Sequence, residues 1–229
     1  MQIIGHRGAR AVAPENTLRA IREGMRCADY VEVDVRLSRE GLPVVIHDAT
    51  LDRTTNGTGF VRNTLFSDLH RLDAGEGERI PTLSQVCDTV GGACGLVVEI
   101  KEQGTEDVIC TMLAERGGNR LYIVSFHADS IARAGVLLPH ATTGLITSRD
   151  QPDPVAAARS AGAGALLPKK DLLTPGLVAS AHREGLLVIP WTLNNEEEIS
   201  RAYDCGADAC ATDDPCRIRR IIARLETTA

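Results

Sequence analysis

Short runs of apolar and β-branched residues recur along the chain, and a segment long enough for a helix follows most of them. This alternation is typical of a parallel sheet built from consecutive βα units. The pattern predicts nine strands, at residues 2–5, 30–35, 43–47, 96–101, 121–125, 142–146, 165–167, 186–191 and 209–212.

The second and third of these strands are separated only by RLSREGL, at residues 36–42. Because this connection is too short for a helical crossover, we expect a local hairpin that extends one strand. Eight parallel strands with intervening helices, in a chain slightly shorter than the roughly 250 residues usual for the class, predict a closed (β/α)8 TIM barrel. An open doubly wound sheet is the alternative, but HRGAR after the first strand is not the GxGxxG motif typical of that fold.

Two segments carry clear helix signals. In residues 14–28, Leu18, Ile21 and Met25 recur at helical spacing. In TPGLVASAHREG, Thr174 is a candidate N-cap and is followed by a proline, which is favoured in the first turn of a helix. Both segments are therefore predicted to be helices of the outer ring.

Residues 49–81 are polar, rich in turn-forming residues and too long for a simple connection. We expect this segment to be an insertion over the mouth of the barrel. Elsewhere the βα pattern is uniform, and 43% of the residues are hydrophobic, which is enough for one large core. The sequence thus predicts a single domain over residues 1–229.

The formal net charge of −6 argues against a general nucleic-acid-binding protein, which needs a basic surface to neutralise phosphates. The start of the chain, MQIIGHRGAR, lacks the basic flank and long apolar stretch of a secretory signal, and no apolar segment is long enough to cross a bilayer. We therefore expect a cytoplasmic protein without nucleic-acid partners or stable membrane insertion. The oligomeric state is left open.

The seven cysteines show no CxxC pair and no zinc-type spacing with histidine, which argues against structural zinc. In a cytoplasmic protein most of them are expected to be reduced, small, apolar residues of the core. We assign them no chemical role.

Charged residues alternate with apolar ones inside two of the predicted strands. In YVEVDV, Glu32 and Asp34 share one face of the strand while valines cover the other. In LVVEIK, Glu99 and Lys101 likewise lie opposite apolar neighbours. Because the helices of a barrel pack on the outer, apolar face, these charged side chains are expected to point into the barrel mouth.

Three converging acids need a compensating positive charge. Two carboxylates ~7 Å apart repel by about 2 kcal/mol at an effective dielectric constant of roughly 20. A hard cation such as Mg²⁺ or Ca²⁺, which prefers oxygen ligands, would compensate Glu32, Asp34 and Glu99. A buried ion-pair network with Lys101 and Arg7 would do so as well, and the acids alone do not decide between the two interpretations.

Two histidines favour a catalytic site. His6 follows the apolar run QIIG and His47 follows PVVI, so each should stand at the C-terminal end of a strand, where barrel enzymes build their active sites. Beside the three acids they form a candidate general acid/base pair, because the pKa of imidazole lies close to neutral pH. The other histidines have no comparable context, although His127 lies just after a predicted strand.

These residues belong to a longer series of motifs: HRGAR, PENT, EVDV, VIHDATLDRTTNGTG, IPTL, VVEIK, IVSF, PWTLN and GADACATDDP, in that order. The series closely resembles the glycerophosphodiester phosphodiesterase family, spans almost the whole chain and is most similar to short bacterial-type members. ACATDDPCR near the C-terminus departs from the family pattern, which affects packing and the rim of the site.

The resemblance implies a TIM barrel with a small insertion after the second strand. It also implies hydrolysis of a small-molecule glycerophosphodiester to sn-glycerol 3-phosphate and an alcohol, with Mg²⁺ or Ca²⁺ as cofactor and Mn²⁺ as a third candidate. Carried over to the matching positions, it implies metal ligands Glu32, Asp34 and Glu99, acid/base catalysts His6 and His47, and phosphate contacts Arg7 and Lys101.

In the expected reaction, the cation and Arg7 neutralise the phosphoryl group while one histidine takes a proton from the nucleophile and the other protonates the leaving alkoxide. The sequence assigns neither part to either histidine. It also leaves open whether water attacks directly or the glycerol 2-hydroxyl attacks first to give a cyclic phosphate.

Further residues are candidates for supporting parts. Trp191, at the end of the seventh strand of the barrel, is a candidate substrate-binding residue that packs on the substrate or simply fills the barrel mouth, and Phe126 is a weaker candidate. Glu15 and Asn16 of PENT are expected to open a helix, and to cap it and support the site rather than to react.

Three other functions compete with this hypothesis. A phosphate-binding barrel aldolase or isomerase would use Lys101 for a Schiff base or proton transfer, but leaves the acids and histidines without a task. A non-catalytic binding module is disfavoured because the complete set of site residues is present. A phospholipase D-like enzyme acting on lipids is disfavoured because no apolar docking stretch is visible.

Overall fold

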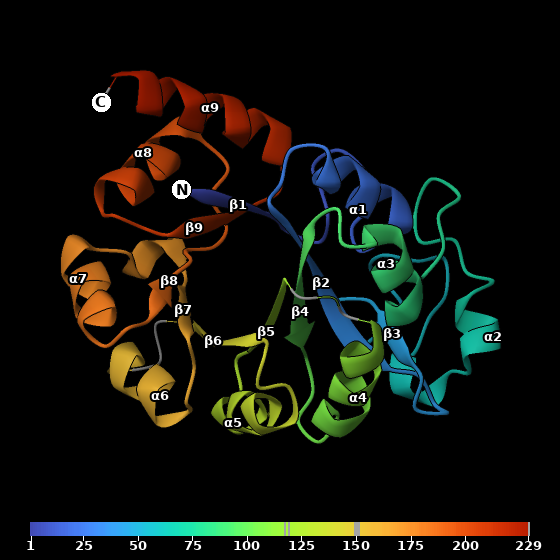
Figure 1. Cartoon of the computed structure of the whole chain (residues 1–229). Coiled ribbons are helices and arrows are strands. Elements are labelled where there is room, and N and C mark those ends of the chain that lie inside the picture. The colour runs from blue at the N-terminus through green and yellow to red at the C-terminus, as the bar shows by residue number, and fades with distance from the viewer. Residues whose placement is uncertain (117, 119, 149–151, 229) are drawn as a thin grey trace.

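A ring of parallel strands occupies the centre of the molecule and is surrounded by helices (Figure 1). The computed structural model describes residues 1–116, 118, 120–148 and 152–228. Its strands are β1 (Gln2–Gly5), β2 (Tyr30–Leu37), β3 (Pro43–Val45), β4 (Gly95–Ile100), β5 (Leu121–Ser125), β6 (Thr142–Thr147), β7 (Ala165–Pro168), β8 (Leu187–Val188) and β9 (Ala209–Thr212). They follow one another in the order β8-β7-β6-β5-β4-β2-β1-β9, and all of these neighbours pair in parallel. The predicted TIM barrel is confirmed.

The ring closes between β8 and β9 through separate hydrogen bonds rather than a regular ladder. The N–H groups of Asp208 and Ala211 donate to the carbonyl oxygens of Val188 and Pro190, both at 3.0 Å. β8 is therefore shorter than the strand predicted at residues 186–191. The reason is that Pro190 has no N–H to donate to a continuous ladder.

The predicted hairpin is confirmed, since β3 pairs with β2 and lies off the ring. On its other side, Val44 of β3 forms an isolated antiparallel bridge with Thr82. The two strands run antiparallel, with Val35 opposite Val45 and Leu37 opposite Pro43. β3 is shorter than the predicted strand at residues 43–47, because after Val45 only the N–H of Ile46 continues the pairing, to the carbonyl oxygen of Asp34.

Helices follow most of the strands and cover the outside of the ring. They are α1 (Leu18–Met25), α2 (Phe66–Leu69), α3 (Leu83–Val90), α4 (Glu106–Arg116), α5 (Ala128–Leu137), α6 (Pro154–Ser160), α7 (Pro175–Arg183), α8 (Glu196–Asp204) and α9 (Pro215–Thr228), with short 3-10 helices η1 (Val61–Asn63) and η2 (Lys170–Leu172). Thr174 caps α7 as expected, because its side chain accepts the Leu177 N–H at 3.1 Å. Among the residues that the structure describes, no helix is long and apolar enough to span a membrane.

The alternation along the strands divides the core into two layers. Val31, Val33 and Val35 are fully buried between the sheet and the outer helices. A separate cluster fills the interior of the ring, made by Ile4, Tyr30, Val97, Tyr122, Val124, Ile146, Ala165, Leu167, Ile189, Ala209 and Ala211. Because Glu32 and Asp34 alternate with the three valines, they face the interior, as predicted.

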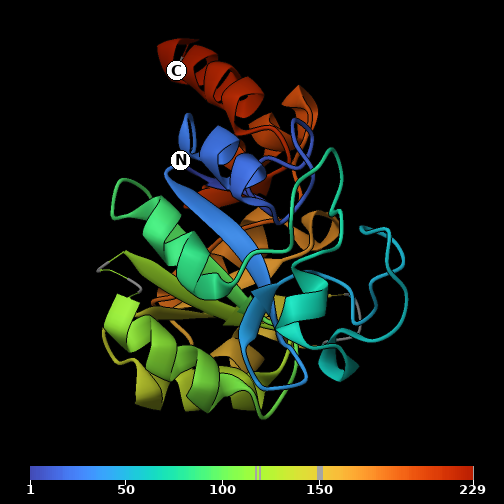
Figure 2. The same cartoon turned by 90° about the vertical axis from the view of Figure 1, so that its right-hand side faces the viewer.

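Residues 49–81 contain η1, α2 and extended loops, and they project beyond the C-terminal ends of the strands at one side of the ring (Figure 2). A small apolar cluster holds the segment against β3: Val44, Ile46, Leu51, Val61, Leu69, Ala74 and Ile80. The segment thus has its own anchor and places its polar loops beside the barrel mouth.

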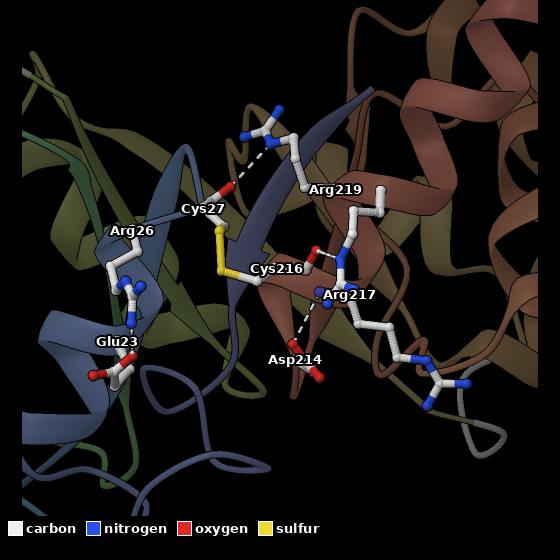
Figure 3. The surroundings of a disulfide bond; sticks show 8 residues. Glu23, Arg26, Cys27, Asp214, Cys216, Arg217 and Arg219 are labelled. Carbon is white, nitrogen blue, oxygen red and sulfur yellow. Dashed lines mark hydrogen bonds and ion pairs between the residues drawn. A yellow bond between two sulfur atoms is a disulfide. The ribbon is translucent and has the colours of Figure 1, made fainter.

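One disulfide, between Cys27 and Cys216, joins the turn after α1 to the first turn of α9 (Figure 3). Sequence analysis did not anticipate it, because 189 residues separate the two cysteines and only the ring brings them together. The other cysteines are free thiols; Cys87, Cys94, Cys110 and Cys210 are buried, as expected for small core residues, and Cys205 is half-buried.

Candidate active site

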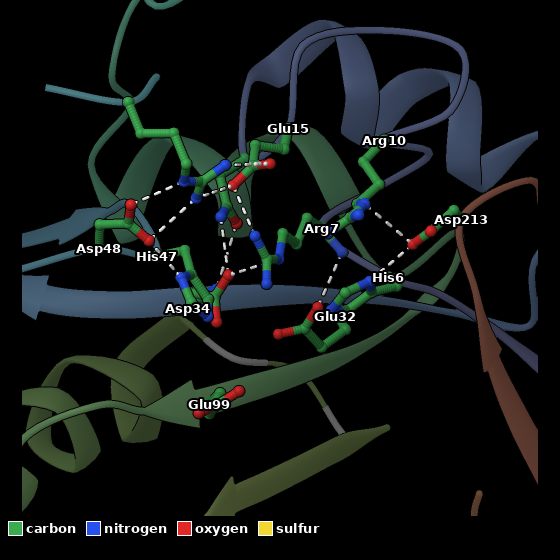
Figure 4. Close-up of polar contacts among 12 residues, drawn as sticks. His6, Arg7, Arg10, Glu15, Glu32, Asp34, His47, Asp48, Glu99 and Asp213 are labelled. Atoms are coloured by element: carbon green, nitrogen blue, oxygen red, sulfur yellow. Dashed lines mark hydrogen bonds and ion pairs between the residues drawn. The ribbon is translucent and has the colours of Figure 1, made fainter. Parts of the chain in front are cut away.

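Most of the predicted site residues meet toward the C-terminal ends of the strands, and Figure 4 shows His6, Arg7, Glu32, Asp34, His47 and Glu99 there. All of these but Asp34 line a cavity of about 130 Å³. The cavity is lined by His6, Arg7, Glu32, His47, Glu99, Lys101, Val124, Phe126, Ile146, Leu167, Trp191 and Ala211. Asp34, which completes the predicted set, is fully buried beside Glu32 and Glu99.

The three acids lie together. Glu32 and Asp34 come from β2, and Asp34 pairs with Glu99 of β4 in the sheet register. One carboxylate oxygen of each lies within 4.8 Å of the others. Among the residues that the structure describes, none donates a hydrogen bond to the buried oxygens Oε1 of Glu32 and Oδ1 of Asp34, although Oδ1 lies 3.3 Å from the Lys101 ammonium in an ion pair. Buried carboxylate oxygens without donors are suited to a hard cation, so the three acids fit a divalent metal.

The pKa shifts of the three acids also indicate a site that can hold a cation. Burial, together with the charges of Asp34 and Glu99, raises the pKa of Glu32 well above its usual range. Burial and the charge of Asp34 raise the pKa of Glu99 to about 7. Burial also opposes ionisation of Asp34, but the charges of Lys101 and Arg7 outweigh it and lower the pKa of Asp34 to about 2. The cluster therefore favours added positive charge.

Two cations of the chain supply part of that charge. Lys101 Nζ lies 2.6 Å from Glu99 Oε1, and Arg7 Nε lies 3.3 Å from Asp34 Oδ2. The backbone N–H of Arg7 donates to Glu32 Oε2 at 2.8 Å, which holds Arg7 in the left-handed region at a φ of 51°. The ion-pair network foreseen as an alternative to a metal site is thus present alongside the Oε1 atom of Glu32, which has no hydrogen-bond partner among the described residues.

His6 is held by a residue that sequence analysis missed. Its Nδ1 lies 2.7 Å from Oδ1 of Asp213, which follows β9. Asn194 donates to the other oxygen of Asp213 at 2.8 Å, and Arg10 Nε lies 3.2 Å from Oδ1. Burial raises the pKa of Asp213, but His6, Arg10 and Asn194 outweigh it and lower the pKa. Asp213 is therefore ionised and fixed, and it leaves Nε2 of His6 as the ring nitrogen available to a ligand.

His47 has an equivalent partner in Asp48, whose Oδ1 lies 2.5 Å from His47 Nδ1. Arg53 donates to Asp48 Oδ2 at 2.7 Å and to Glu15 Oε1 at 2.8 Å. Hydrogen bonding by Arg53 holds the pKa of Asp48 well below its usual range, whereas burial lowers the pKa of His47. Glu15 continues the network, since Arg7 Nη1 donates to it at 2.6 Å.

The PENT residues support the site. Asn16 Nδ2 donates to Asp34 Oδ2 at 2.8 Å and Asn16 Oδ1 accepts the Asp34 N–H at 3.2 Å, so one side chain fixes this acid twice. The expected support of the site is present, but the prediction that Glu15 or Asn16 caps the helix is wrong, because Thr17 caps α1 by accepting the Ala20 N–H. Both residues precede the helix; Asn16 binds Asp34, and Glu15 binds Arg7 and Arg53.

The sequence did contain a signal for Asp213, one of the site residues that were not predicted. Asp213 directly follows a predicted strand, in TDDP, and the rule that placed His6 and His47 at the barrel mouth also applies there. Asn194 and Arg53 lie in irregular segments, where spacing predicts no direction for a side chain. Trp191 lines the cavity, and its role in substrate binding stays a prediction.

The chain matches the model of the glycerophosphoryl diester phosphodiesterase family over residues 6–217. The chain belongs to this family. A glycerophosphodiester phosphodiesterase of Caldanaerobacter subterraneus is 36% identical over 228 residues, an alignment that covers 93% of this chain and 94% of the relative. The predicted family and the predicted enzyme class, a phosphoric diester hydrolase, are therefore confirmed.

Solved structures of the glycerophosphoryl diester phosphodiesterase family share the fold. A phosphodiesterase of Oleispira antarctica, in complex with its product sn-glycerol 3-phosphate, is similar at a TM-score of 0.92 and 29% identity, covering 97% of each chain. A glycerophosphoryl diester phosphodiesterase assigned in Silicibacter pomeroyi is similar at a TM-score of 0.91 and 26% identity, covering 98% of this chain and 94% of the other.

Proposed function

We propose that this chain hydrolyses glycerophosphodiesters to sn-glycerol 3-phosphate and an alcohol, using one divalent cation and two histidines. The observation that carries the proposal is the clustering of three buried carboxylates beside two imidazoles, each bound to its own aspartate, in one cavity. Relatives named for this activity support it. The cytoplasmic location expected from the sequence stays a prediction.

Glu32, Asp34 and Glu99 would hold the cation, for which Mg²⁺ and Ca²⁺ are the first candidates and Mn²⁺ the third. When bound, such an ion supplies Lewis-acid polarisation of a phosphoryl oxygen. Oε1 of Glu32, which is buried and has no hydrogen-bond partner among the described residues, supports this assignment.

Arg7 and Lys101 line the same side of the cavity as the acids. A phosphodiester anion repels a nucleophile until its charge is neutralised, and fixed cations in a partly buried site do so effectively. We assign phosphate contact to both residues. Their many bonds to the acids keep them in place before a substrate arrives.

His6 and His47 act as the acid/base pair. Because each Nδ1 is bound to an aspartate, the tautomer is set and Nε2 serves the substrate. One imidazole takes the proton of the nucleophile, and the other donates a proton to the departing alkoxide.

Lys101 argues against the aldolase or isomerase hypothesis. Burial lowers the pKa of Lys101, but the charges of Asp34 and Glu99 outweigh it and raise the pKa. A Schiff-base lysine must be neutral to react, so this ammonium is suited to charge neutralisation instead.

The test is an assay of glycerophosphocholine, glycerophosphoethanolamine and bis(p-nitrophenyl) phosphate after chelation, with Mg²⁺, Ca²⁺ and Mn²⁺ added back one at a time. We expect turnover only with a cation, and none in His6→Ala or His47→Ala. His182→Ala is the matched control, because His182 pairs with Asp208 away from the cavity. Rates of the two site variants equal to that of the control would refute the acid/base assignment.

A further inference from the structure

The side chains that line the cavity are charged on one side of the ring and apolar on the other. The charged residues come from β2 and β4, together with the segments that follow β1, β3 and β4. The strands β5, β6, β7 and β9 contribute apolar residues instead: Val124, Ile146, Leu167 and Ala211. The change falls between β4 and β5, where Glu99 and Val124 are partners in the sheet register. One half of the cavity is therefore charged and the other is not.

Two aromatic residues extend the apolar half toward solvent. Phe126 follows β5 and is 40% exposed, and its ring meets that of Trp191 edge to face, with centroids 5.7 Å apart. The indole N–H of Trp191 donates to the carbonyl oxygen of Leu167 at 2.9 Å. Trp191 thus presents only carbon to the cavity.

We define the apolar wall as Val124, Phe126, Ile146, Leu167, Trp191 and Ala211. Among the described residues, no side chain of this wall offers an unused donor or acceptor. A hydroxyl or ammonium group placed against it would lose its hydrogen bonds to water without replacement, whereas a hydrocarbon group would gain from leaving water. The partners for glycerol hydroxyls and for phosphate lie on the charged half.

We propose that the apolar wall binds an uncharged, hydrocarbon-rich alcohol substituent of the phosphodiester, such as an alkyl chain. This inference rests on the proposed function and narrows its substrate class. In the overall reaction, water adds to phosphorus, the P–O bond to the apolar alcohol breaks, and that alcohol leaves with a proton. Glycerol phosphate stays on the charged half.

A quaternary ammonium group is the competing occupant, because aromatic rings bind such cations through their faces. Here the two rings pack on each other edge to face, so they do not form a slot between parallel faces. The other four members of the wall are aliphatic, and no described residue of the wall is acidic. Neutral hydrocarbon is favoured over choline.

The test has a binding arm and a turnover arm. In the binding arm, calorimetry on the cation-loaded protein measures the Kd of n-alkyl phosphates from ethyl to octyl. In the turnover arm, kcat/KM is measured for sn-glycero-3-phospho-n-alkanols of the same lengths and for glycerophosphocholine. We expect each added methylene to improve both quantities about two- to fourfold until the wall is covered.

Phe126→Ser should flatten this dependence on chain length. Phe60→Ser is the matched control, because Phe60 is also an exposed aromatic residue, at 48%, and does not line the cavity. Affinities that do not change with chain length, or a higher kcat/KM for glycerophosphocholine than for every alkyl diester, would overturn the inference. If no diester is turned over but the Kd still falls with chain length, the proposed function fails and the inference about the wall stands.

Discussion

His6 Nδ1 lies 2.7 Å from Asp213 Oδ1, although the two residues are 207 positions apart in the sequence. The contact crosses from the end of β1 to the end of β9, which are neighbours in the ring. The side chain of Asn194 fixes Asp213 twice from a third segment: its Nδ2 donates to Asp213 Oδ2 at 2.8 Å, and its Oδ1 accepts the Asp213 N–H at 2.9 Å. The orientation of His6 therefore depends on both ends of the chain.

Asp213→Asn should lower kcat roughly 10- to 100-fold with little change in KM, because the charge that sets the His6 tautomer is lost while the phosphate contacts remain. Steady-state kinetics with glycerophosphoethanolamine measure both values. The control is Asp208→Asn, since Asp208 binds His182 at the other end of β9. Equal kcat in the two variants would show that Asp213 does not position His6.

Asp213 should also make stability depend on pH. Its pKa is lowered in the folded protein, so its stabilising effect is fully present above the unfolded value of about 3.9 and is lost as the pH falls through the folded value. In urea, the free energy of unfolding of Asp213→Asn should therefore lie further below that of the natural protein at pH 7 than at pH 3. A difference in the free energy of unfolding that is the same at both pH values would contradict this prediction.

Glu32→Gln should abolish the response to cations and, in metal-free protein, raise the melting temperature by several degrees. The glutamine removes a buried charge beside Asp34 and Glu99, and its oxygen can still accept the Arg7 N–H. A gain of about 1 kcal/mol corresponds to roughly 2–4 °C in a protein of this size. Calorimetric scans with and without Mg²⁺ or Ca²⁺ measure both effects, and a cation-induced shift that survives in the variant would remove Glu32 from the metal site.

Arg53→Gln should lower kcat about 3- to 10-fold, because Asp48 and Glu15 lose the guanidinium that joins them. Arg62→Gln is the control from the same insertion, since Arg62 lies over the ring of Phe60 and outside the network. The kcat values of the two variants are compared in initial-rate assays at one cation concentration. If the two variants have the same kcat, Arg53 does not help to orient His47.

Reduction of the disulfide should destabilise the protein by roughly 2–5 kcal/mol, since the bond closes a very long loop. Cys27→Ser should reproduce the loss, measured as the free energy of unfolding in urea. Cys205→Ser, at a half-buried free thiol, is the control. A natural protein whose unfolding is unaffected by reductant would show that the bond does not form.

The regular parts of the molecule could be predicted from the sequence because strand periodicity fixes the direction of a side chain. Glu32, Asp34 and Glu99 alternate with buried residues, so their common face followed from the pattern. Asp213 was missed as the partner of His6 because that contact depends on closure of the ring. Arg53 lies in an irregular loop, where local pattern carries no information about distant neighbours.

The Cys27–Cys216 bond encloses β2 to β9 in one covalent loop and leaves only β1, α1 and most of α9 outside it. A single backbone cut anywhere within residues 49–81 would therefore leave two fragments that stay tethered to each other. Such a nicked molecule would reassemble as a unimolecular reaction, at a rate independent of protein concentration, for as long as the sulfur atoms remain oxidised.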